Sequence, residues 1–197
     1  MGAAMRGRVL GLVVTGGSGP LHGLGIPNDA ALTPFAGKYR FIDFALAAAT
    51  NSGVGPVYVV GSRPSAALHA HLGRAARAGA ELRRPLPIPL PGSGRDGGRA
   101  ARLVRALAGT AQLVRHHRAQ AIVVLTADHI LQLDLRQLLE AHATLAADVT
   151  LATLPVPMAE APRRTVLEVS ADRRVVDVPR PSVVPGVAES ALAAEGR

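Results

Sequence analysis

The hydrophobic pattern of this chain alternates between short apolar runs and longer segments with helical spacing. Val9 to Thr15, Val57 to Val60 and Ala121 to Thr126 are apolar runs rich in β-branched residues, and each predicts a buried strand. Between them, Arg40 to Asn51 and Pro64 to Ala80 have the composition and spacing of helices, the second capped by Ser62 or Ser65. This alternation favours an α/β fold with a doubly wound, mainly parallel sheet and right-handed crossovers.

The second half of the chain continues the pattern. Arg99 to His116 has helical spacing, and Leu135 to Ala146 predicts an amphipathic helix. Val149 to Pro155 predicts a fourth strand. Two further strands, Val166 to Ser170 and Val175 to Val178, are expected to form a hairpin with its turn at Asp172. The apolar side of the first of these helices is expected to hold four residues: Leu103, Leu107, Ala111 and Val114.

Two segments show neither the apolar runs of a strand nor the spacing of a helix. Residues 83–98 carry prolines at alternate positions from Pro85 to Pro91, followed by a glycine-rich patch. Proline excludes a helix there and makes a poor strand, so a surface loop or mobile excursion is expected. After Pro179 the chain is rich in proline, alanine and glycine. We therefore expect one domain over residues 1–181 and a disordered tail over residues 182–197.

Composition narrows the class of protein. The chain has 197 residues, and 48% of them are hydrophobic, which is enough for a buried core in one domain. No run approaches the roughly 18–20 apolar residues of a membrane span, so no membrane association is expected. Cysteine is absent, which excludes disulfides, cysteine–zinc sites and cysteine nucleophiles. Nothing favours export, and a cytoplasmic location is expected.

The net charge of +8 raises the question of a polyanionic partner. Lys38 is the only lysine, so the other basic residues are all arginines, as in a chain with GC-biased codons. Aromatic residues make up 3% of the chain, which leaves little for stacking on single-stranded nucleic acid. The balance favours small anionic ligands and no nucleic-acid partner.

Candidate chemistry follows two of the predicted strands. Gly16, Gly17 and Gly19 come directly after the first strand, where glycines allow backbone N–H groups to approach a phosphate. Asp128 follows the third strand and suits a Mg²⁺ ion that bridges nucleotide phosphates. Ligands of doubly wound sheets bind beyond the carboxyl ends of the strands, where both features fall. A tight turn and a carboxylate that caps the next turn are the alternatives.

The histidines are interpreted as structural residues. His116 and His117 are adjacent, and His69 and His71 are two apart, so neither pair shares a helix face in the way a metal pair requires. His129, next to Asp128, is expected to make structural hydrogen bonds. No GxSxG motif for a nucleophilic serine is present.

Several motifs together carry a resemblance to a known family. Residues 35–54, FAGKYRFIDFALAAATNSGV, are similar to FGGKYRIIDFxLSNxxNSGI, and LGLVVTGGSG is similar to ALVLAGGxG. VVLTADHILQLDL matches VLxLxGDHxYxMDY, and ADVTLATLPVPMAEA matches ADVTxxxxxVPxxEA. SRPSAALHAHL and RRVVDVPRPS resemble two further segments in the same order. The chain thus resembles the catalytic domain of glucose-1-phosphate adenylyltransferase (ADP-glucose pyrophosphorylase), a sugar nucleotidyltransferase.

The resemblance implies a fold, a reaction and a site. It implies a Rossmann-like nucleotidyltransferase domain that is incomplete at its C-terminus, without the rest of the sugar-binding half. The reaction would convert ATP and glucose 1-phosphate to ADP-glucose and pyrophosphate with Mg²⁺, in glycogen biosynthesis. The resemblance implies that Asp128 binds the metal and Arg180 binds the sugar phosphate. The residues that it implies to bind the nucleotide are Gly16, Gly17, Gly19 and Gly98.

Departures from the family pattern point to an impaired enzyme. The family's phosphate-binding arginine falls on Leu21 or His22, and its lysine falls on Ala30. Each lost charge-assisted contact is worth about 1.5–3 kcal/mol, so two or three losses slow transfer by powers of ten. Asn28 stands near a family arginine, Ala101 replaces a family aspartate, and Ser62 replaces a family glutamine. The family's EKP sequence is replaced by Pro179–Arg180–Pro181. Residues with the charge to substitute are Arg6, Arg8, Arg63, Arg95 and Arg99.

Three functional hypotheses remain open on these residues. The chain is a degraded, non-catalytic relative that serves as a regulatory partner, a residual nucleotidyltransferase or simple nucleotide-binding module that uses Gly16, Gly17, Gly19 and Asp128, or a pseudogene-like product with no stable role. The expected ligands are ATP and glucose 1-phosphate, and the expected protein partner is a second copy or a full-length homologue.

Overall fold

A computed structural model describes the chain over residues 8–16, 30–61, 65–81, 87–90, 99–128, 130, 132–157, 159, 161 and 165–178. The chain divides into two compact units, Met1–Asp148 and Val149–Arg197, which are treated separately below. The expectation of a single domain over residues 1–181 stays a prediction. The predicted tail at 182–197 lies outside the described residues.

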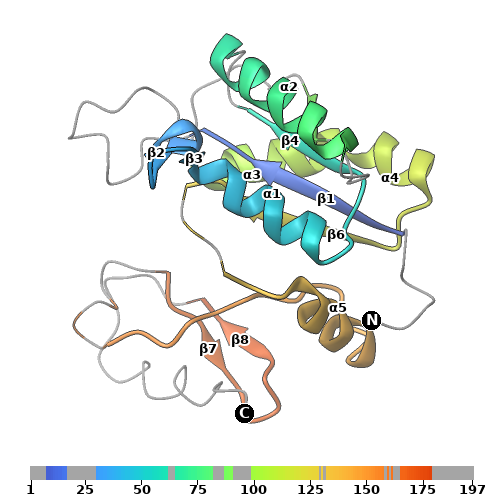
Figure 1. Ribbon diagram of the computed structural model, residues 1–197. Coiled ribbons are helices and arrows are strands. Elements are labelled where there is room, and N and C mark those ends of the chain that lie inside the picture. Colours follow the sequence, from blue (N-terminus) through green and yellow to red (C-terminus); the bar gives the residue numbers. More distant parts are fainter. Residues whose placement is uncertain are drawn as a thin grey trace. The chain divides into compact units, whose positions relative to one another are not determined.

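The first unit contains a four-stranded parallel sheet (Figure 1). The strands lie in the order β5-β4-β1-β6, and every neighbouring pair is parallel. Their bounds are Val9–Val14 for β1, Val57–Val60 for β4, Pro87–Leu90 for β5 and Ala121–Thr126 for β6. All six residues of β1 are buried, as a central parallel strand requires. The predicted doubly wound α/β fold and its first three predicted strands are confirmed.

Helices cover both faces of this sheet. On one face lie α1 (Phe41–Asn51), α2 (Ala66–Glu81) and α5 (Leu135–Thr144), and on the other lie α3 (Arg99–Gly109) and α4 (Ala111–His117). Alternate residues of β1 serve the two cores: Val9 and Val13 pack toward α1, whereas Leu10, Leu12 and Val14 pack toward α3. The helices α1 and α2 each return the chain to the start of the next parallel strand, β4 and β5 respectively.

Gly11 allows β1 to lie close to the entry of β4. A Cβ on Gly11 would lie 3.1 Å from the Cγ2 of Val57 and 3.2 Å from the Cγ1 of Val54. The Gly11 amide also donates to the carbonyl oxygen of Pro56 over 2.9 Å. The missing side chain at Gly11 therefore sets the spacing of the two central strands.

The expectation of a loop throughout residues 83–98 is wrong at Pro87–Leu90, which form strand β5. Among the strands that the structure describes, it pairs with β4, in the register Val57↔Pro87 to Val60↔Leu90. Alternate residues of a strand direct their amides to opposite edges, so alternate prolines remove donors from one edge only. Pro87 and Pro89 are therefore compatible with a strand that pairs on one side.

The single helix predicted over Arg99 to His116 is wrong, because Thr110 divides it into α3 and α4. The hydroxyl of Thr110 donates to the carbonyl oxygen of Leu107 over 2.7 Å, and Thr110 is buried. The side chains that reach the core include Ala106 and Thr110, whereas Leu107 is exposed. Because the helix is divided at Thr110, the apolar side of α4 does not continue the apolar side of α3.

The second unit contains an antiparallel hairpin of β7 (Glu168–Val169) and β8 (Val175–Asp177), as predicted. Arg173 occupies the left-handed region at φ 63° in its turn. The strand predicted over 149–155 is wrong, because these residues form no regular element and Val149 and Leu154 are 73% and 85% exposed. Apolar alternation alone forms no strand without a paired neighbour.

Within the described residues, no helix has the length and apolar character needed to cross a membrane.

Candidate functional site

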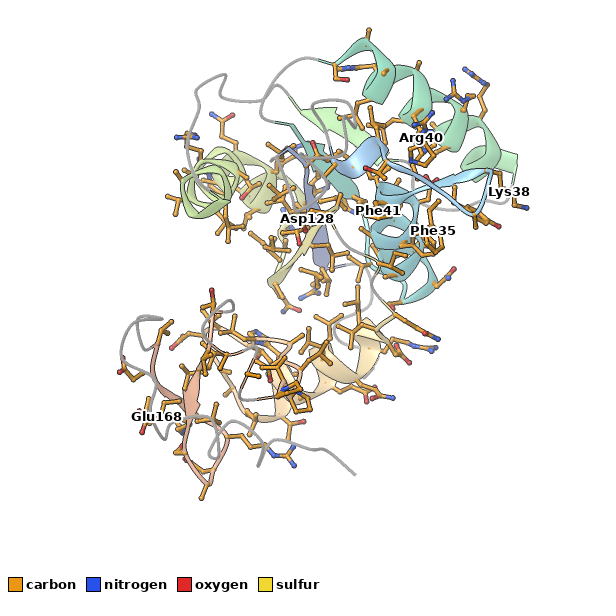
Figure 2. The ribbon with its side chains drawn as sticks, turned by 90° about the vertical axis from the view of Figure 1, so that its left-hand side faces the viewer. Phe35, Lys38, Arg40, Phe41, Asp128 and Glu168 are labelled. Atoms are coloured by element: carbon orange, nitrogen blue, oxygen red, sulfur yellow. The ribbon has the colours of Figure 1, made fainter. Side chains whose placement is uncertain are left out.

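The carboxyl ends of β1 and β6 bring the two predicted phosphate-binding features to one edge. The strands pair in parallel up to Val14↔Thr126, and the amide of Ala127 donates to the carbonyl oxygen of Val14 over 3.1 Å. Gly16 and Asp128 each lie two residues beyond these paired ends. They therefore share the edge at which doubly wound sheets bind ligands. Figure 2 looks onto this edge, with Asp128 near the middle of the first unit.

The glycine turn leaves β1 in a conformation that favours glycine. Gly16 has φ 90°, which lies in the left-handed region. The preceding Thr15 is 2% exposed, and its amide donates to the carbonyl oxygen of Val60 over 2.8 Å. Thus β1 is paired on both sides up to the residue at which the turn begins. Gly17 and Gly19, also predicted to bind the nucleotide, lie outside the described residues, as do Gly98 and Arg180.

Asp128 is the metal-ligand candidate at this edge, and it is partly buried. Mg²⁺ at nucleotide sites uses one or two carboxylates together with phosphate oxygens and water. Asp128 fits an ion that arrives with a triphosphate. A resident ion would need more ligands, and the described residues contain no group of three histidine, aspartate or glutamate side chains that could hold one.

Apolar packing replaces a cation at the position where the resemblance places the family's lysine. Ala30 begins the short 3₁₀ helix η3 (Ala30–Leu32) and is 7% exposed. Its methyl group is part of the protein interior. The guanidinium Nη1 of Arg40 donates to the carbonyl oxygen of Leu32 over 2.5 Å, which fixes this segment to the start of α1. Leu21, His22, Asn28 and Ser62 lie outside the described residues, and Ala101 is partly buried in α3.

Arg8 is excluded as a substitute cation. The amide of Gln120 donates to the carbonyl oxygen of Arg8 over 2.8 Å, which places Arg8 at the amino ends of β1 and β6. That edge is opposite to the one that carries Gly16 and Asp128. Of the other suggested arginines, Arg6, Arg63 and Arg95 lie outside the described residues, and Arg99 is the first residue of α3.

The most specific motif of the resemblance builds a network at the start of α1. One carboxylate oxygen of Asp43 accepts from the amide of Arg40 over 2.7 Å, and the other lies 2.6 Å from His71 Nε2. The side chains of His71 and Asp43 are 12% and 23% exposed. Asp43 therefore closes the first turn of α1 and joins it to α2. Sequence reasoning did not single out Asp43, although a carboxylate three residues after a helix start is a capping signal.

Structural roles are also seen for several other polar residues of the chain. Ser65 caps α2, since its Oγ accepts from the amide of Leu68 over 3.2 Å. His117 is the last residue of α4, and its Nε2 lies 2.6 Å from the hydroxyl of Tyr58, which agrees with the structural role predicted for the histidines. In the second unit, Arg173 and Arg174 are exposed residues of the turn between β7 and β8. His129 lies outside the described residues.

Asp134 caps α5, the helix that follows Asp128 along the chain. Its Oδ1 accepts from the amide of Arg136 over 3.0 Å, and its two oxygens also accept from the Arg136 guanidinium. These hydrogen bonds to Arg136 hold the pKa of Asp134 below its ordinary value. At the same end of the helix, the amide of Leu135 donates to Ser52 Oγ over 3.2 Å.

Comparison with known proteins gives one family and a consistent set of relatives. The family model described as "Nucleotidyl transferase" matches residues 10–179. The glucose-1-phosphate adenylyltransferase of Thermus caldophilus is 33% identical over 207 residues, which cover 95% of this chain and 48% of the relative. Proteins with the same name from Deinococcus radiodurans and Anaeromyxobacter sp. are 31% and 32% identical and are covered to 49% and 47%. The chain spans about half the length of the curated relatives it matches.

Proposed function

Because this chain belongs to the nucleotidyl transferase family, we propose that its carboxyl edge binds ATP with Mg²⁺ and that its adenylyl transfer to glucose 1-phosphate is impaired. The observation that supports binding is the shared edge of Gly16 and Asp128, fixed by the parallel register of β1 and β6. The names of the relatives support the choice of ATP and glucose 1-phosphate. The assignments to glycogen synthesis and to the cytoplasm are part of the same proposal.

The proposed binding uses the backbone and one carboxylate. Gly16 has φ 90°, and glycines in this turn would let backbone N–H groups approach phosphate oxygens without a Cβ in the way. Asp128 would hold the Mg²⁺ ion that neutralises the triphosphate. The bound ion supplies charge neutralisation at the phosphates. Gly17, Gly19 and Gly98 for the nucleotide, and Arg180 for the sugar phosphate, complete the proposed site.

The proposed impairment follows from the missing cations. Phosphoryl and nucleotidyl transfer depend on positioning and on positive charge around the reacting phosphates. Ala30 is buried in η3 where the resemblance places a lysine, and Arg40 is bonded to Leu32 within the fold. Arg8 lies at the opposite edge. Ground-state binding of a metal–nucleotide needs fewer of these cations than stabilisation of the transition state, so binding survives where transfer does not.

Two assays on the purified chain test the proposal. Calorimetry should detect binding of ATP with Mg²⁺ to the wild-type chain and a loss of affinity of about tenfold in Asp128→Asn. Asp148→Asn, at an exposed carboxylate after α5, is the matched control and should bind as the wild type does. An absence of ATP binding in the wild type contradicts the proposal and favours a purely regulatory partner. Rapid pyrophosphate release with glucose 1-phosphate contradicts the impairment.

A further inference from the structure

Two buried threonines of the first unit carry hydroxyl groups that none of the described residues satisfies. They are Thr15, which directly follows β1 and is 2% exposed, and Thr33, which is 6% exposed. Thr33 lies between η3 and the short hairpin of β2 (Pro34–Phe35) and β3 (Tyr39–Arg40). Neither hydroxyl oxygen has a hydrogen-bond partner within the described part of the chain. A buried hydroxyl without a partner lowers the stability of a fold.

Threonines in the helices show how such a hydroxyl is usually satisfied. The hydroxyl of Thr50 donates to the carbonyl oxygen of Leu46 over 2.9 Å, and that of Thr110 donates to Leu107 over 2.7 Å. Both acceptors are helix carbonyl oxygens three or four residues earlier in the chain. A residue at the end of a strand has no helix turn before it, so Thr15 cannot use this kind of acceptor.

The strand carbonyl groups beside Thr15 already accept from amides. The carbonyl oxygen of Val14 accepts from Ala127, and that of Val60 accepts from the amide of Thr15 itself. By the alternation of β1, Thr15 continues the side of Val13, which packs in the apolar core under α1. A valine would fill nearly the same volume without a hydroxyl. Thr15 therefore keeps a polar group where packing favours an apolar one.

The position of Thr15 connects its hydroxyl with the proposed nucleotide site. Thr15 stands between the last residue of β1 and Gly16, where the proposed phosphate-binding turn begins. The similar family pattern ALVLAGGxG has alanine at this position, so the hydroxyl is a departure of this chain from that pattern. Thr33 lies on a different segment, and its carbonyl oxygen accepts from the amide of Phe41 at the start of α1. Only Thr15 of the two adjoins the proposed site.

We propose that the Thr15 hydroxyl donates a hydrogen bond to a phosphate oxygen of the bound nucleotide. Its oxygen is buried, so the side chain must rotate about the Cα–Cβ bond to reach the ligand, and the adjoining Gly16 has no side chain to hinder this. A charged acceptor makes such a hydrogen bond stronger than a neutral one. The inference rests on the proposed binding of ATP and assigns part of its affinity to this neutral donor.

Calorimetry of the full chain with ATP and Mg²⁺, inorganic triphosphate and Mg²⁺, and adenosine tests the assignment. Thr15→Val removes the hydroxyl and nearly keeps the shape, so it should weaken binding of ATP and of triphosphate about tenfold. Its affinity for adenosine should not change. Thr15→Ser keeps the hydroxyl and should bind ATP nearly as the wild type does. Thr33→Val, the matched control, removes the other unsatisfied hydroxyl and should leave the affinity for ATP unchanged.

Urea unfolding gives a second readout that a purely structural threonine would not affect. Without nucleotide, Thr15→Val and Thr33→Val should both unfold at higher urea concentrations than the wild type, because each removes an unsatisfied hydroxyl. At one fixed concentration of ATP with Mg²⁺, the stabilisation by the ligand should be smaller for Thr15→Val alone. Circular dichroism checks that each variant is folded, and Thr15→Ala takes the place of Thr15→Val if that variant is not.

The outcomes separate this inference from the proposed function. A wild type that binds no ATP with Mg²⁺ overturns both. If the wild type binds ATP and Thr15→Val binds it equally well, this inference alone is overturned. The same holds if Thr33→Val loses as much affinity, if the loss is confined to adenosine, or if Thr15→Val is less stable than the wild type without nucleotide.

Discussion

The segment from Ala30 to Asn51 and the carboxyl edge of the sheet differ in what their polar residues do. In the first, Asp43 bonds to the Arg40 amide and to His71 of α2, and the Arg40 side chain bonds to the Leu32 carbonyl oxygen. These contacts hold α1, α2 and η3 together. At the edge, Gly16 leaves β1 at φ 90° and Asp128 follows β6, so both lie just beyond the carboxyl ends of paired strands. The residues that most closely resemble the family motif therefore maintain the fold, and close resemblance there carries no information about catalysis.

Removal of the Asp43 carboxylate is expected to have the largest effect on stability. Asp43→Ala should lower the free energy of unfolding by about 2 kcal/mol, because the Arg40 amide and His71 each lose a charged partner. Urea unfolding measures the loss. His71→Ala and the double variant complete a cycle, and additive losses would show that the two side chains are not coupled.

Substitution of Asp128 should, in contrast, weaken ATP binding more than it lowers the stability of the fold. Asp128→Asn should cost about 1.4 kcal/mol of affinity for ATP with Mg²⁺, which is tenfold, and much less in stability. Calorimetry and urea unfolding of the same preparation compare the two. A variant that unfolds as readily as Asp43→Ala, while it binds ATP normally, would assign Asp128 to the structural group instead.

A smaller gain in stability is expected in the turn of the β2–β3 hairpin. Ala36 has φ 49°, a conformation that costs a side chain about 1 kcal/mol and glycine almost nothing. Ala36→Gly should relieve this strain. Part of the gain is lost because glycine has more freedom in the unfolded chain, so the free energy of unfolding should rise by only about 0.5 kcal/mol. Urea unfolding tests this, and a destabilised variant would show that the backbone there is not strained.

The weakest effect is expected at Asp134, where α5 begins. The hydrogen bonds from Arg136 lower the pKa of Asp134 from its ordinary 3.8, so the carboxylate contributes stability above that pH and loses it as the pH falls through the folded pKa. Asp134→Asn should flatten the acid limb of the stability curve slightly. An unchanged acid limb, measured by circular dichroism below pH 5, would mean that the exposed pair contributes nothing.

The fold could be predicted from sequence where the pattern is continuous. Val9–Val14, Val57–Val60 and Ala121–Thr126 are buried strands because they lie between two helical layers, and their apolar runs show it directly. The hydrophobic pattern did not predict the secondary structure of two segments in which local contacts determine it. Pairing with β4 makes Pro87–Leu90 a strand, and a turn at Thr110 divides a helix that has continuous apolar spacing.

The candidate site could be located from sequence but not characterised. The rule that ligands bind at carboxyl ends was sufficient to place Gly16 and Asp128 at one edge. The network around Asp43 and the gathering of Phe35, Tyr39 and Phe44 required coordinates, because they join residues that no periodicity relates. The low aromatic content was interpreted as leaving little for stacking on single-stranded nucleic acid, and it gave no sign that four of the five rings lie together at the β2–β3 hairpin and α1.

The release of pyrophosphate from ATP and glucose 1-phosphate with Mg²⁺ tests the central claim most directly. We expect the chain, under conditions in which it binds ATP, to release pyrophosphate at least about a thousandfold more slowly than the Thermus caldophilus relative. A rate close to that of the relative, abolished by Asp128→Asn, would show that other cations serve the site and that transfer is intact.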